Sequence, residues 1–191
     1  MKLEAYFYLI LLLSFQSVFG NWQDGIAEKQ IKTIKDYFFL LPPEWLDCEN
    51  PESFSTQQSR SSAIKIVDEK NGYIQFFNKA EIALFKDKKN NTDLIALQIG
   101  ECGEGAHCQN INSVFVYNST QRKWVEQKQL IPASANCVKI YDEKIDSGIC
   151  PYWKLPRYGR QIEVKNEHTD KVIAIIEWTG QSFNTVVLGT Q

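Results

Sequence analysis

The stretch AIKIVDEKNGYIQFF, residues 63–77, decides the fold class of this chain. Two short runs rich in β-branched and aromatic residues, 63–67 and 73–77, lie on either side of Asn71-Gly72. Such runs are typical of strands, and an Asn-Gly pair supplies the positive φ that a tight hairpin turn needs. The stretch therefore predicts an antiparallel hairpin, and it marks where the apolar period changes from about 3.6 residues to about 2.

Runs of the same kind recur to the end of the chain, separated by charged or polar turns. They span residues 81–85, 94–99, 113–117, 123–127, 138–141, 161–165, 172–178 and 183–188. No helical pattern separates them, whereas parallel strands need crossover connections that are usually helices. We therefore expect a mainly β (α+β) fold. Residues 63–188 should form an antiparallel β-meander, as a curved sheet or a small barrel or sandwich.

The segment before the hairpin predicts one N-terminal amphipathic helix over residues 24–41. Its apolar residues recur at steps of four and three: Ala27, Ile31, Ile34, Phe38 and Leu41. Asp24 can cap the helix start, and Pro42-Pro43 ends it because a residue before proline avoids the helical region. We expect this helix to cover one face of the sheet. Residues 44–62 are polar and predict an irregular linker.

The first twenty residues have the pattern of a cleaved signal peptide. An apolar run over 5–13 precedes Val18 and Gly20, compact residues that suit cleavage after Gly20. The run is too short to span a bilayer core of about 30 Å, and no second stretch is long enough. We expect a single secreted or periplasmic domain over residues 21–191 with no stable membrane span.

The charge balance excludes one class of partner. The chain has 191 residues, with 21 Lys and Arg against 23 Asp and Glu, and a formal net charge of −2. Nucleic-acid binding needs a basic face, and no block of like charge points to an anionic membrane surface. We therefore expect no nucleic-acid partner.

Five cysteines follow the leader, and an oxidising compartment favours disulfides. An odd number allows at most two internal bridges. We expect Cys102–Cys108 and Cys137–Cys150, which close short loops, and a Cys48 that stays unpaired.

The segment 101–108 also holds His107 and two glutamates, so a metal site is the alternative interpretation. Its cysteine spacing does not match the common zinc patterns, and an oxidised pair supplies no thiolate ligand. We therefore expect a disulfide here, with no metal and no cofactor.

Catalytic motifs are scarce. His107 and His168 are the two histidines, and no nucleophile elbow, zinc-binding helix or phosphate loop occurs. Cys48 could act as a nucleophile with His107, but its acidic neighbours would raise the thiol pKa. Glycosidase-like hydrolysis needs two carboxylates at a suitable separation. That alternative stays open, with Glu177 beside Trp178 as one aromatic context.

The segment 150–160 offers the best binding surface in the sequence. Three aromatic residues and three cations interleave between two prolines: Tyr152, Trp153, Lys154, Arg157, Tyr158 and Arg160. Exposed rings there could stack on sugars or anchor a protein partner. In the alternative interpretation, Trp153 and Leu155 plug one end of the sheet while the cations are solvated.

Four further stretches together carry a resemblance. They are Asn71-Gly72-Tyr73-Ile74, Ala83-Leu84-Phe85-Lys86, Trp124 ahead of Leu130-Ile131-Pro132, and Trp178-Thr179-Gly180-Gln181-Ser182-Phe183. Over residues 60–188 the chain resembles a loose group of exported bacterial proteins of unknown function. The resemblance implies a fold and a compartment, and it carries over no active site.

Taken together, the sequence predicts a secreted, non-enzymatic binding or interaction protein, associated with the cell envelope. Its partner would be a protein or a polysaccharide. Two alternatives are a hydrolase that uses a carboxylate pair and a structural component of the envelope.

Overall fold

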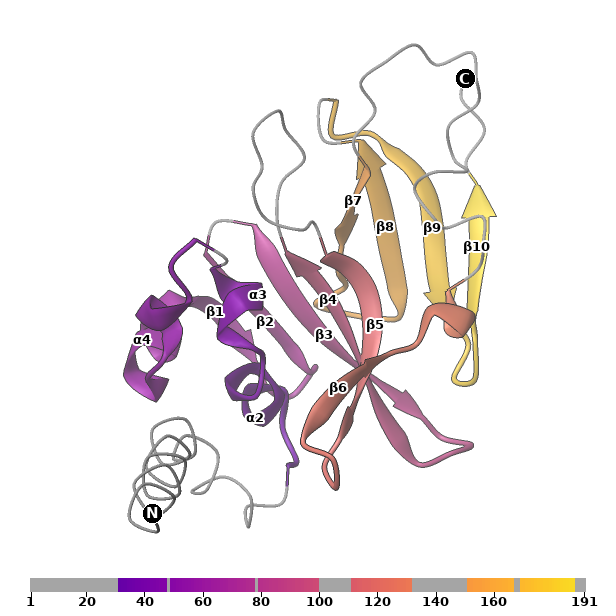
Figure 1. Cartoon of the computed structure of the whole chain (residues 1–191). Helices are drawn as coiled ribbons and strands as arrows, with labels where there is room; N and C mark the ends of the chain where they lie inside the picture. Colours follow the sequence, from indigo (N-terminus) through magenta and orange to yellow (C-terminus); the bar gives the residue numbers. More distant parts are fainter. Residues whose placement is uncertain are drawn as a thin grey trace, which may run out of the picture. The chain divides into compact units, whose positions relative to one another are not determined.

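The computed structural model describes residues 31–47, 49–77, 79–99, 111–131, 151–166 and 169–187. In these residues the chain forms ten strands in two antiparallel sheets, together with short helical segments (Figure 1). All of the strands lie in the unit Thr33–Gln191. The predicted fold class, mainly antiparallel β, is confirmed.

The larger sheet is a six-stranded meander in which each strand pairs with the next along the chain. It is curved and does not close, because β1 and β6 stay at its two edges (Figure 1). Its strands are β1 (Ile64–Asp68), β2 (Tyr73–Phe76), β3 (Ala80–Asp87), β4 (Thr92–Ile99), β5 (Ile111–Asn118) and β6 (Lys123–Glu126).

The β1–β2 hairpin turns where the sequence predicts it. Gly72 has φ +67°, and a Cβ atom there would lie 2.8 Å from the Cβ atom of Leu84. Glycine is therefore required twice, by its backbone conformation and by the close approach of β3.

The smaller sheet has four strands in the order β10-β9-β8-β7. They are β7 (Pro151–Lys154), β8 (Gln161–Asn166), β9 (Val172–Trp178) and β10 (Phe183–Val187). Strand β7 is absent from the sequence-based prediction, although a proline is tolerated as the first residue of a strand. The short strand predicted at 138–141 lies outside the described residues.

The helical predictions need correction. The first described helix, α2 (Ile34–Phe39), starts after Thr33, which is extended and accepts a hydrogen bond from the Asp36 amide. The Asp36 carboxylate accepts one from the Thr33 amide in return, and this capping box marks the start of the helix at Ile34. The predicted helix is therefore not continuous over 24–41, and its residues 24–30 lie outside the described ranges.

Residues 44–62 are more ordered than the irregular linker that the sequence predicts. They contribute to α3 (Pro43–Leu46), η1 (Pro51–Phe54) and α4 (Gln57–Ala63), and a further short helix, η2 (Lys128–Leu130), follows β6. No helix in the described ranges is long and apolar enough to cross a membrane.

The six-stranded sheet is covered on both faces. One face contributes Tyr73, Phe85 and Val114 to a core shared with the four-stranded sheet. On the other face the Phe76 ring packs against Phe38 of α2, with ring centroids 5.0 Å apart. This double coverage explains why β3 and β4 are buried almost throughout rather than at alternate residues.

Candidate functional site

A row of polar side chains crosses the sheet face that meets the four-stranded sheet. Gln75, Glu81, Gln98 and Asn112 lie directly opposite one another on β2, β3, β4 and β5. Directly paired residues of neighbouring strands project from the same face. The row therefore places four hydrogen-bonding side chains beside an otherwise apolar core.

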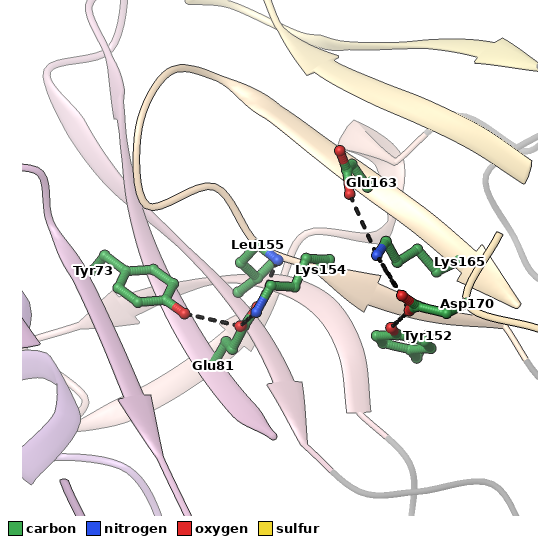
Figure 2. A network of polar contacts seen from close by, with 8 residues as sticks. All are labelled: Tyr73, Glu81, Tyr152, Lys154, Leu155, Glu163, Lys165 and Asp170. Atoms are coloured by element: carbon green, nitrogen blue, oxygen red, sulfur yellow. Dashed lines mark hydrogen bonds and ion pairs between the residues drawn. The ribbon is translucent and has the colours of Figure 1, made fainter. Parts of the chain in front are cut away.

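Glu81 is the centre of this row and is only 1% exposed. Its Oε1 atom accepts hydrogen bonds from the Tyr73 hydroxyl, at 2.8 Å, and from the Lys154 ammonium, and its Oε2 atom accepts one from the Leu155 amide at 2.7 Å (Figure 2). Burial and the hydrogen bond to Glu81 raise the pKa of Tyr73 above its ordinary range, so its hydroxyl stays a donor. Both oxygens of Glu81 are therefore occupied by donors of this chain.

The polar row also binds β7 to the six-stranded sheet. The Trp153 amide donates to Oδ1 of Asn112 at 3.2 Å, and the Leu155 amide donates to Glu81 as above. Two backbone donors of β7 and the segment after it are thus satisfied by side chains of the opposite sheet, which is how a buried strand edge avoids unpaired groups. The row joins the two sheets.

A second polar cluster lies on the outer side of β7 and β8. The Tyr152 hydroxyl donates to Oδ1 of Asp170 at 2.5 Å, and the Lys165 ammonium lies 3.2 Å from both Asp170 oxygens (Figure 2). The hydrogen bond from Tyr152, followed by that from Lys165, lowers the pKa of Asp170. Glu163 lies 3.9 Å from the same ammonium. The Tyr152 hydroxyl therefore already has a hydrogen-bond partner in this chain.

The loop after β7 presents a single aromatic ring. Tyr158 is 68% exposed, and the guanidinium of Arg157 lies over its ring at 5.3 Å from the centroid. The Arg157 Nε atom donates to Asp68 of β1 at 3.1 Å. Gly159, with φ +86°, makes the bend that follows. The loop is thus anchored at Arg157, and its tip projects Tyr158.

The link between Arg157 and Asp68 should depend on pH. Hydrogen bonds from Asn71, and next from Arg157, hold the pKa of Asp68 below its ordinary 3.8. A carboxyl with a lowered folded pKa stabilises the fold above its unfolded pKa and loses this effect as the pH falls through the folded value. We expect the link to be intact at pH 5 and lost only below pH 3.8.

Carbon-13 NMR of the Asp68 carboxyl measures this titration. Asn71→Ala removes the largest cause and should move the Asp68 pKa upward, toward 3.8. A wild-type Asp68 that titrates above 3.8 would contradict the assignment.

The structure separates the six residues that the sequence offers as a binding surface. Trp153 is 2% exposed and lies with Leu155 in the shared core, as in the alternative interpretation of a plug. Tyr152, Lys154 and Arg157 each form a hydrogen bond or an ion pair with a carboxylate of this chain. Tyr158 and Arg160 are exposed at the loop tip.

Sequence reasoning did not find Glu81 and its polar row. The available signal was a glutamate and a glutamine inside the apolar runs 81–85 and 94–99. A buried polar residue in such a run needs a partner, and the partners of Glu81 are Tyr73 of β2, Lys154 of β7 and Leu155 after β7.

The geometry gives no support to carboxylate chemistry at the buried acids. Besides Glu81, Asp87 is buried, and its carboxylate accepts hydrogen bonds from Lys89 and Asn90 of its own turn. Glu177 is exposed while Trp178 is buried, because successive strand residues point to opposite faces. Within the described ranges no three potential metal ligands gather.

The cysteine and histidine predictions lie outside the described residues. They concern Cys48, Cys102, Cys108, Cys137, Cys150, His107 and His168. The two disulfides and the unpaired cysteine stay predictions. Comparison of the chain with protein-family models, with curated proteins and with solved structures finds no match.

Proposed function

We propose that the protein is a non-enzymatic binding protein of an exported compartment, and that loop 156–160 is its recognition surface. The observation that carries this proposal is the 68% exposure of Tyr158 on an anchored loop. A large ring held in place costs little conformational entropy on binding. Exposed tyrosine and arginine are also the residue types that dominate binding hot spots.

The charges around the loop favour a sugar ring over an anionic polymer. Lys154 is paired with Glu81 and Arg157 with Asp68, so two of the three cations are already neutralised. One face of the Tyr158 ring is taken by the Arg157 guanidinium. The other face suits stacking against the apolar face of a sugar, while guanidinium N–H groups reach its hydroxyls. The proposed ligand is therefore a polysaccharide.

Tyr158→Ala tests the proposal. We expect about a tenfold loss of affinity for the polysaccharide, the equivalent of about 1.4 kcal/mol, because the stacking ring is removed. The melting temperature should stay unchanged, since substitutions at exposed positions usually alter stability by less than about 0.5 kcal/mol. Binding is measured on a panel of immobilised neutral and acidic polysaccharides.

Val186→Ala is the matched control, because Val186 is an exposed apolar residue on β10. It should bind the panel as the wild type does. Unchanged binding by Tyr158→Ala would contradict the proposed surface. If the wild type binds a protein and no polysaccharide, the proposed ligand class is wrong. The role of the loop would then be tested by measuring binding of Tyr158→Ala to that protein.

A further inference from the structure

A pocket opens beside the start of β1, away from the Tyr158 loop that is fastened to the end of the same strand. It has a volume of about 330 Å³ and is lined by Phe54, Ser62, Ala63, Lys65 and Phe77. Pockets that hold small molecules have volumes from about 300 Å³ upward and combine apolar walls with a few polar groups. The pocket fits the lower end of that range.

Two aromatic rings form the apolar wall. The rings of Phe54 and Phe77 meet edge to face, with centroids 5.1 Å apart and planes at 82°. Both residues are half-buried, and both line the pocket. Phe77 also packs against the ring of Phe76, which is fully buried. The apolar wall of the pocket therefore packs against the core of the six-stranded sheet.

The backbone of Phe77 adopts a conformation that is uncommon for a bulky residue. Its φ is +52°, in the left-handed region that favours glycine or asparagine. The Phe77 amide donates to the Ala63 carbonyl at 3.0 Å, beside the irregular register between Ile64 and Ile66. Strained residues of this kind cluster at ligand sites. Because phenylalanine occupies this position in place of the usual glycine or asparagine, an aromatic residue lines the pocket here.

The cationic residue Lys65 also lines the pocket. Lys65 is exposed, and none of the described carboxylates forms an ion pair with it. The Ser62 hydroxyl donates to the Ser59 carbonyl, so its lone pairs stay available as an acceptor. The pocket is thus lined by two aromatic residues, one cationic residue and one hydroxyl-bearing residue.

We infer that this pocket binds a small carboxylate-bearing molecule with a flat apolar body. The body would lie against the rings of Phe54 and Phe77, and the carboxylate would pair with the Lys65 ammonium. This site goes beyond the proposed function, because it uses no residue of loop 156–160.

Phenylacetate and its uncharged analogue phenylacetamide are the probes. They have the same ring and differ in charge, so their affinity ratio isolates the contribution of Lys65. Titration of the nitrogen-15-labelled protein should shift the amide signals of Ser62, Lys65 and Phe77 for both probes. We expect phenylacetate to bind about three- to fivefold more tightly, the scale of an exposed ion pair.

Lys65→Gln should make the two affinities equal, and Lys70→Gln, at an exposed lysine of the β1–β2 turn, should leave the ratio unchanged. Phe77→Leu should weaken both probes about threefold while the ratio stays the same, because it keeps apolar volume and removes the flat ring. Signal shifts elsewhere on the protein, equal affinities in the wild type, or a preference that survives Lys65→Gln would overturn the inference. Tyr158→Ala should leave probe binding unaltered, which separates this test from that of the proposed function.

Discussion

Replacement of Glu81 by alanine is expected to lower the free energy of unfolding by about 3 kcal/mol. The change leaves the Tyr73 hydroxyl and the Leu155 amide without their acceptor, and a buried donor left unsatisfied costs about 1–3 kcal/mol. Lys154 also loses its counter-charge, but its side chain is 44% exposed and can be hydrated, which limits that contribution. The melting temperature should fall by about 6–12 °C for a domain of this size.

Urea unfolding measures the effect, and a second glutamate provides the control. Glu163 lies 3.9 Å from Lys165 on β8, and its side chain is exposed. Glu163→Ala should therefore cost less than about 0.5 kcal/mol, as exposed ion pairs usually do. Equal losses from the two substitutions would show that Glu81 is not the link between the sheets.

The six-stranded meander could be predicted because its information is local. Alternation along each strand, with Asn71-Gly72 in the first turn, specifies neighbouring antiparallel strands that need only short connections. Gly72 is also irreplaceable for a local reason, its positive φ. Interactions between residues close in the sequence decide this part of the fold.

Strand β7 could not be predicted in the same way. Trp153 and Leu155 alternate with Tyr152 and Lys154, which is a strand pattern, but prolines and cations around it favour a surface loop. What holds this edge strand against the six-stranded sheet is distant in the sequence. The acceptor for the Trp153 amide is 41 residues away, and that for the Leu155 amide is 74 residues away.

Long separation in the sequence also explains why only part of the candidate site could be predicted. Tyr158 and Arg160 belong to the aromatic and cationic segment that the sequence offers as a binding surface, because exposed rings and cations there could contact a ligand. The buried part of the site, Glu81 with its partners, was not predicted. In the sequence Lys154 has the pattern of a solvated cation, and its pairing with Glu81 is evident only from the structure. Long-range pairing of charges leaves no periodic signal in a single sequence.

Trp153→Ala is expected to lower the free energy of unfolding by about 3–5 kcal/mol, the usual cost of truncating a buried tryptophan. The indole is 2% exposed and packs in the shared core with Leu155, Ile162 and Trp178. Its removal leaves a cavity at the contact between the two sheets, where rigid strands cannot close the space. Chemical unfolding followed by circular dichroism measures the loss.

Trp153→Phe distinguishes packing from hydrogen bonding. The indole Nε1 atom is buried and has no acceptor among the described residues, so deleting this N–H group loses no hydrogen bond. The phenyl ring keeps much of the apolar volume, and we expect a cost of about 1–2 kcal/mol, well below that of alanine. Should Trp153→Ala unfold as the wild type does while polysaccharide binding is lost, the indole would be a ligand contact, and recognition would extend from Tyr158 into β7. A large loss of stability instead assigns Trp153 to the core and leaves Tyr158 as the ring that meets the ligand.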